Sequence, residues 1–253
     1  MQDSNPSFSI EPSQHFERYQ IHISPKKILQ FIMVVIVILS LISFVIKLPD
    51  NLQINYPYRS SLVKVFYVDS EKNVPSLFSV TLLFFDSFVL AIIAHLKRIA
   101  KHANLGHWLG LSTIFFFLAM DECFSFHELL VSPLHDALHV HGGLLTFSWV
   151  VGGGIFVLLF LLSYTRFTFK LPAKTRRLFI TAFALYVGGA IGLEMIGGNL
   201  ADLYGFESLP YLIETTVEES IEMLGAAVFL YALLSYLKSQ LPDREIHLCL
   251  HKK

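Results

Sequence analysis

Acidic residues interrupt three long apolar stretches of the chain, and their types and spacing are those of a cation-binding site. The candidate ligands are Asp121, Glu122, His127, Glu128, Glu194, Glu218, Glu219 and Glu222. An ionisable group inside a membrane is costly unless it faces a polar or wet interior. Carboxylates brought close together stay there only with shared protons or with a bound cation among them. The pattern therefore predicts either a metal site or a proton-sharing acidic cluster.

Histidines in the loop after the first acidic stretch add nitrogen ligands. His135 and His139 are four residues apart, a spacing that places both imidazoles on one face of a helix, as in paired metal ligands. The alternative is a solvated loop that is rich in histidine. Carboxylate and imidazole ligands without a thiolate cluster suit Fe, Mn or Zn. We therefore expect a divalent metal of this kind as the cofactor.

The elements that must position these residues are apolar helices. The chain has 253 residues, of which 54% are hydrophobic and 15% charged, against roughly 25% charged in soluble domains. Six stretches approach the roughly 20 residues that a helix needs to cross a bilayer. They lie at about 28–47, 75–96, 107–128, 143–165, 178–198 and 215–237. The predicted fold is all-α, a polytopic transmembrane bundle of six helices.

The domain organisation follows from these limits. Residues 28–238 form one six-helix transmembrane domain, flanked by polar tails at 1–27 and 239–253. Most Lys and Arg lie in the two tails and in the second and fourth loops, whereas the other side has only Lys47, Arg59, Lys64 and Lys72. The positive-inside rule then predicts that both termini are cytoplasmic. We expect a multi-pass protein of the bacterial inner membrane.

Depth and helical phase bring the acids together at the outward side. With this orientation Asp121, Glu194 and Glu218 all fall in the outer third of their spans. At about 100° per residue, Asp121, Ser125 and Glu128 share one face of the third helix, and His127 points to a different side. Glu218 and Glu222 lie one turn apart in the sixth span. The site is therefore expected to face outward.

Asp86 is a separate acidic residue near the middle of the second span. Its functional interpretation is a proton relay or cation step below the outer cluster. The structural alternative is an Asp that forms a hydrogen bond to a neighbouring helix.

Other classes of protein are excluded by charge and cysteine content. The formal net charge is -1, so no basic surface is available for nucleic acid. Two cysteines provide no disulfide framework. The oligomeric state stays open.

Three acidic motifs support a resemblance to a group of bacterial proteins. They are D-E-x4-H-E at 121–128, E-x2-G-G at 194–198 and E-E-x2-E-M-x-G at 218–225. In this combination the chain resembles uncharacterised bacterial multi-pass membrane proteins over roughly residues 74–237. The resemblance implies the same six-span arrangement and brings no assigned reaction.

The leading functional hypothesis is an outward-facing metal site that performs metal-assisted chemistry on a lipid, a quinone or another membrane-soluble substrate. A second hypothesis is a cation- or proton-coupled transporter with Asp86 as the midplane step. A third is a structural or assembly subunit whose acids fix the register of the helices. The sequence alone leaves open whether the protein is an enzyme.

Overall fold

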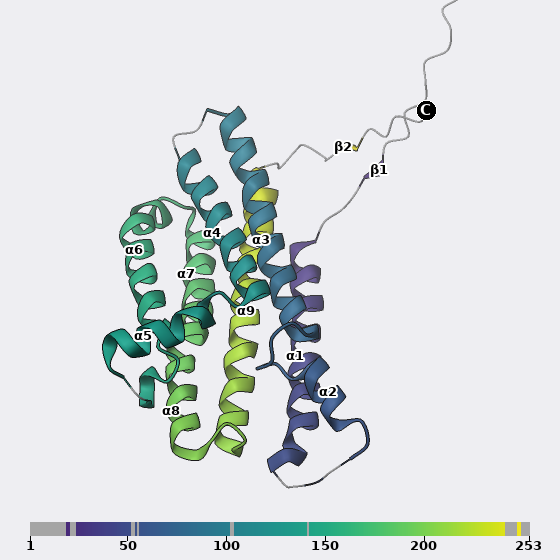
Figure 1. Ribbon diagram of the computed structural model, residues 1–253. Coiled ribbons are helices and arrows are strands. Elements are labelled where there is room, and N and C mark those ends of the chain that lie inside the picture. Colours follow the sequence, from purple (N-terminus) through teal and green to yellow (C-terminus); the bar gives the residue numbers. More distant parts are fainter. Residues whose placement is uncertain are drawn as a thin grey trace, which may run out of the picture.

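The computed structural model describes residues 19–20, 24–51, 54, 56–101, 104–140, 142–240 and 247–248 (Figure 1). Apart from one antiparallel pair of two-residue strands, β1 (Tyr19–Gln20) and β2 (His247–Leu248), these residues form helices and short connections. The predicted all-α class is therefore confirmed. The predicted polar tails lie largely outside the described residues.

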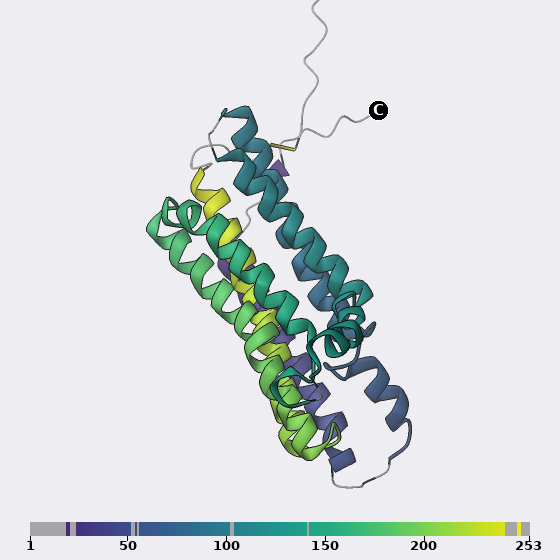
Figure 2. The ribbon, with the colours of Figure 1, turned by 60° about the vertical axis from the view of Figure 1, so that its left-hand side comes forward.

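Nine α-helices follow one another in the described part of the chain. They are α1 (Pro25–Asn51), α2 (Arg59–Phe66), α3 (Val74–Ile99), α4 (Leu105–Phe124), α5 (Val131–Leu138), α6 (Trp149–Phe169), α7 (Ala173–Val187), α8 (Glu194–Tyr204) and α9 (Leu209–Gln240). Two short 3-10 helices, η1 (His127–Leu130) and η2 (Gly143–Leu145), flank α5, and the π-helical segment η3 (Gly188–Leu193) joins α7 to α8. Figure 2 shows the long helices running nearly parallel along the bundle.

Five helical segments in the described residues are long and apolar enough to cross a membrane, with α7, η3 and α8 together making one of 32 residues. A sixth candidate is the pair formed by Leu105–Phe124 and His127–Leu138, which is bent by 79°. These six segments correspond to the six apolar stretches of the sequence, with helix ends shifted by several residues. The helices are thus compatible with a multi-pass membrane protein.

The third predicted helix ends earlier than expected. It was predicted to continue to residue 128, but α4 stops at Phe124 because Ser125 adopts a left-handed conformation, with φ of 55°. The amide of Ser125 still donates to the carbonyl of Asp121, at 2.6 Å, and closes the last turn. The predicted common face of Asp121 and Glu128 is therefore wrong, because the two residues belong to different helices.

Helix α9 is the centre of the bundle. It packs against α1, α3, α7 and α8, and Figure 1 shows it between α7 and α1. Small residues let its neighbours approach closely, among them the buried Ala226, Ala227 and Ala232. At Gly225 an added Cβ would lie 2.7 Å from the backbone nitrogen of Tyr186. Residue 225 therefore sets the separation of α7 and α9.

Helix α6 is packed far less tightly than α9. Its closest backbone contacts are to α7, η3 and η1, and Phe167 near its end packs on Trp108 of α4. Only 11% of its most apolar stretch is buried, the smallest share among the five unbent candidate spans. Gly152 and Gly154 in α6 have no neighbouring atom within 4 Å of an added Cβ. One side of the bundle is therefore loosely closed.

The two ends of the bundle differ in charge. At one end of the bundle lie the starts of α1, α4 and α7 and the ends of α3, α6 and α9 (Figure 1). Eleven of the fifteen described Lys and Arg residues belong to these segments or lie next to them: Lys26, Lys27, Lys97, Arg98, Lys101, Arg166, Lys170, Lys174, Arg176, Arg177 and Lys238. The other four, Lys47, Arg59, Lys64 and Lys72, belong to the end of α1, to α2 and to the connection that follows α2. The acidic residues of α4, α8 and α9 lie toward the other end. This polarity agrees with the even number of spans expected from the sequence.

We predict that Gly225→Ala lowers the free energy of unfolding by about 1–3 kcal/mol, because α7 must move away from α9. The matched control is Gly154→Ala in α6, where space is open and the helix gains up to about 1 kcal/mol in propensity. Thermal unfolding of the two variants in the same detergent checks this. Equal midpoints for both would contradict the close approach at Gly225.

Candidate functional site

A cavity of about 460 Å³ runs inside the bundle between α4, α6, α7 and α9. Its lining extends along α6 from Trp149 to Phe169, which is about 30 Å at 1.5 Å per residue. One end is lined by carboxylates and the remainder by aromatic and aliphatic side chains. The cavity therefore connects a polar chamber to an apolar channel.

The polar chamber gathers acids from four segments of the chain. They are Glu71, Asp121, Glu122, Glu194, Glu218, Glu219 and Glu222. Among the described residues that line the cavity there is no Lys or Arg, and His127 is the one basic side chain. Acids far apart in the sequence thus share one chamber with little compensating positive charge.

Asp121 holds His127 in place. One carboxylate oxygen accepts the backbone N–H of His127 at 2.9 Å, and the other lies 3.0 Å from its Nδ1. The chain can return in this way because Ser125 reverses its direction after α4. The other ring nitrogen, Nε2, is left for a further partner. A metal-binding imidazole usually has such a carboxylate on its second nitrogen.

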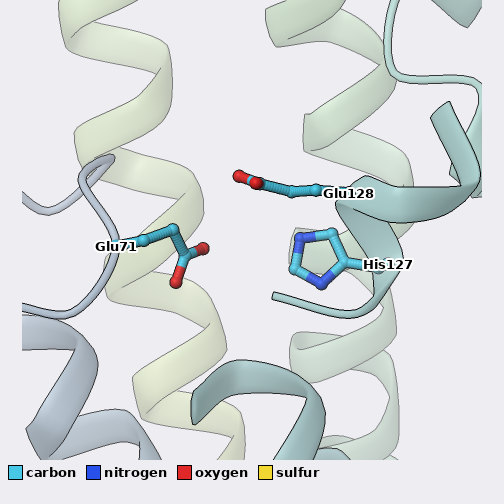
Figure 3. Close-up of side chains that lie close together, drawn as sticks. All are labelled: Glu71, His127 and Glu128. Carbon is cyan, nitrogen blue, oxygen red and sulfur yellow. The ribbon is translucent and has the colours of Figure 1, made fainter. Parts of the chain in front are cut away.

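Glu71, His127 and Glu128 form a compact group at the mouth of the cavity. Each offers one ligand atom, and these atoms all lie within 4.8 Å of one another. Figure 3 shows the two carboxylates and the imidazole pointing toward a common space. Among the described residues this is the one group of three or more metal-ligating side chains so close together.

Glu71 reaches this group from the connection between α2 and α3, which is fixed by hydrogen bonds. The side chain of Asn73 donates to the carbonyl of Tyr67 at 2.6 Å and accepts the amide of Ser76 at 3.0 Å, which starts α3. The amide of Val68 donates to the Ser43 hydroxyl of α1 at 3.0 Å. The position of Glu71 is therefore set by contacts on both sides of the connection.

Glu71 is a carboxylate that lacks a complete set of partners. Its Oε2 is buried without a hydrogen-bond partner among the described residues. Burial raises the pKa of Glu71 above its ordinary value, whereas the Ser125 hydroxyl and His127 act in the opposite direction. An orphaned carboxylate oxygen beside an imidazole is the arrangement that a bound cation would complete.

Most of the remaining acids of the polar chamber lie on α8 and α9, farther into the cavity than the compact group. The indole nitrogen of Trp149 donates to Oε1 of Glu194 at 3.1 Å, and Glu194 interacts electrostatically with Glu218. Glu222 lies against Gly189 of the π-helical segment, where an added Cβ would be 2.5 Å from its Cγ. A glycine in a π-helical turn therefore makes room for this carboxylate.

Glu122 connects the two groups of acids. It interacts electrostatically with Glu71 and His127 at the mouth, and with Glu219 and Glu222 on α9. Glu122 therefore lies near both groups of acids, and Glu194 likewise interacts with His127 and with Glu222.

A second polar group stands beside the chamber at Asp69. Its carboxylate accepts the Tyr211 hydroxyl at 3.0 Å and the Thr215 hydroxyl at 3.4 Å. The pKa of Asp69 is raised to about 6, mainly because the carboxyl loses hydration, and the negative charge of Glu194 contributes to the increase. One side of the residue stays exposed. The hydrogen bond from Tyr211 acts in the opposite direction.

Several residues singled out in the sequence lie elsewhere. His135 and His139 do not line the cavity. His135 is bound through Nε2 to the carbonyl of Leu145 at 3.1 Å, and His139 is exposed in a left-handed conformation that ends α5. Glu128 lies at the mouth, outside the cavity lining. Asp86 is fully buried in α3, and neither of its oxygens has a hydrogen-bond partner among the described residues.

Sequence reasoning missed Glu71, Asp69 and the role of Trp149. A signal was available in the segment Tyr67-Val68-Asp69-Ser70-Glu71, which places two acids just before the second span, on the same side as the acidic cluster. No helical periodicity applies to a connection of this kind, so its two acids were not linked to those in the spans.

The fold and the site define an all-α protein with helices of membrane-spanning length and an acidic and histidine cluster toward one end of the bundle. The chain belongs to the family described as a domain of unknown function (DUF8692), whose model matches residues 29–237. Neither the curated proteins nor the solved structures contain a significant match. The bacterial origin suggested by the motifs stays a prediction.

We predict that Asp121→Asn changes the tautomer of His127. The wild-type carboxylate accepts a hydrogen bond from Nδ1–H, whereas an amide that turns its N–H toward Nδ1 would favour the tautomer with the proton on Nε2. Histidine ¹⁵N NMR at alkaline pH, with His127→Ala used to assign the signal, measures this. An unchanged tautomer in the variant would show that Asp121 does not orient the ring.

Proposed function

We propose that the protein is a multi-pass membrane protein that binds a divalent metal through Glu71, His127 and Glu128. The observation that carries the proposal is the convergence of these three ligands, with Asp121 holding the far nitrogen of the imidazole. Two carboxylates and one imidazole suit Fe, Mn or Zn. Three protein ligands leave coordination positions for water or substrate, as in catalytic metal sites.

The geometry needs only a small adjustment to accept a metal. A tetrahedral ion with bonds of about 2.1 Å holds its ligand atoms about 3.4 Å apart. The ligand atoms here lie within 4.8 Å of one another, so the widest pair must close by at most about 1.4 Å. Glu128 is exposed, and rotation of its side chain can supply this movement.

The orientation in the membrane follows from the charge of the two ends. We propose that the end rich in Lys and Arg is cytoplasmic, together with both termini, and that the metal site faces outward. The separation of basic and acidic ends in the bundle supports this orientation.

The proposed activity is metal-assisted chemistry on a membrane-soluble substrate. A bound metal supplies a Lewis acid at the mouth of the cavity. Glu122 is placed to carry protons between this mouth and the deeper acids, because it interacts with both groups. The apolar channel that continues from the acids supports the proposal that the substrate enters from the bilayer.

We expect protein purified without chelator to retain about one metal ion per chain. His127→Ala should lower the metal affinity by about a hundredfold or more, and Asp121→Ala by about ten- to a hundredfold through the orientation of His127. His135→Ala is the matched control, because that imidazole binds a backbone carbonyl instead. Elemental analysis and competition with a chelator measure the affinities. Absence of Fe, Mn and Zn from the wild type, or equal losses in the two histidine variants, would reject the site.

The transport hypothesis requires Asp86 as a step along the membrane pathway. Asp86 does not line the cavity, and it is completely buried, so no observation favours this hypothesis over the metal site. Asp86→Asn should therefore leave metal content unchanged and shift the unfolding midpoint by only a few degrees, because no hydrogen bond among the described residues is lost. Proton-coupled uptake into liposomes that disappears in this variant would instead establish transport.

A further inference from the structure

The cavity has walls of two kinds, and together they describe an amphiphilic ligand. Acids surround one end of the cavity, whereas Leu111, Phe115, Phe160, Phe183 and Phe229 line the part toward the other end. We infer that the cavity binds a single-chain amphiphile with a protonated amine as its head group, with the amine among the acids and the chain in the channel. The inference deepens the proposed function, because it names the substrate class of the same site.

The apolar channel has the dimensions of a hydrocarbon chain. From Gly153 to Phe169 the lining of α6 covers about 24 Å, and one leaflet of the hydrocarbon core is about 15 Å thick. The cavity volume of about 460 Å³ lies in the range of small-molecule sites. A single extended chain therefore fits this narrow, elongated space.

The channel is open on one side toward the region that a bilayer would occupy. Phe156 of α6 and Ile180 of α7 both line the cavity, yet each is 48% exposed. The closest backbone contacts of α6 are to α7, η3 and η1, and its ring contacts with α4 lie near the basic end, where Phe167 packs on His107 and Trp108. The exposed Phe156 and Ile180 mark the open side. An amphiphile can thus enter sideways without passing through water.

The charge of the chamber selects the head group. The described lining residues include no Lys or Arg, so an anionic head such as a carboxylate would face several acids of the same sign. A protonated amine is attracted by the same acids. Its three N–H donors can each reach a different carboxylate.

The spacing of the deeper acids favours an amine over a second metal ion. Among the described residues, only Glu71, His127 and Glu128 bring three ligand atoms within 4.8 Å of one another. Glu222 interacts electrostatically with Glu122 and with Glu194, but the three do not form such a group. A wider set of acceptors suits a substituted ammonium, which binds through separate hydrogen bonds instead of a compact coordination shell.

Trp149 supplies a reporter at the head-group end. Its indole donates to Glu194 at 3.1 Å, and its ring centroid is 5.0 Å from that of His127. The chain has one other tryptophan, Trp108, which is buried at the opposite end of the bundle against Phe167 and Tyr236. A quencher next to the amine should therefore affect Trp149 alone.

The test measures binding of hexadecylamine to the full-length protein in detergent, in competition with hexadecanol and hexadecanoate. We expect the amine to bind about tenfold or more tightly than the carboxylate. A hexadecylamine that carries a nitroxide quencher on a chain carbon near the nitrogen should quench fluorescence in the wild type but not in Trp149→Phe. Equal binding of amine and carboxylate, or quenching that persists in Trp149→Phe, would overturn the inference.

Two tryptophan substitutions in α6 test the location of the chain. Val157 lines the cavity, whereas Ile155 is 58% exposed and does not. Val157→Trp should weaken amine binding by about tenfold or more, and Ile155→Trp should leave it unchanged. Equal affinities in these two variants would also overturn the inference, because they would place the amine outside the channel.

Metal loss and amine binding are separable in the same experiment. His127→Ala should lose the metal and still bind hexadecylamine, because the deeper acids and the channel are unchanged. If the wild type binds the amine but contains no metal, only the metal proposal is rejected. If it contains metal but shows no preference for the amine, only this inference is rejected.

Discussion

Negative charge gathered inside an apolar bundle is the constraint on which the rest of the structure depends. Seven acids line one cavity, and His127 is the basic side chain among its described lining residues. Carboxylates this close together need protons, hydrogen-bond donors or a cation. Trp149 supplies a donor to Glu194, and Asp121 is occupied by His127. The remaining acids are the reason to expect a positively charged ligand.

Local backbone features make room for these acids. The π-helical segment η3 precedes Glu194, and its Gly189 leaves space for Glu222. The left-handed Ser125 ends α4 and turns His127 back toward Asp121. Each feature departs from a regular helix, and each lies next to a carboxylate of the chamber. Departures of this kind commonly mark functional positions.

The sequence was sufficient for the architecture and for much of the acidic chamber. Hydropathy located the six apolar segments, and the depth of Asp121, Glu194 and Glu218 along their helices placed them toward one end. The end of α4 could not be found in this way, because it depends on a left-handed Ser125 and on hydrogen bonds of the Asp121 side chain. Glu71 was missed because it lies in an irregular connection, which is fixed by a contact with the distant Ser43 and by local hydrogen bonds of Asn73. The spacing of His135 and His139 was misleading, since the carbonyl of Leu145 occupies His135.

Metal-edge X-ray absorption on the purified protein tests the central claim most directly, because it reports the ligands of a bound ion. We predict one imidazole nitrogen at about 2.0–2.1 Å with oxygen donors completing the shell, and loss of the imidazole contribution in His127→Ala. A shell with two or more imidazoles, a sulfur ligand, or a spectrum unchanged by His127→Ala would contradict it.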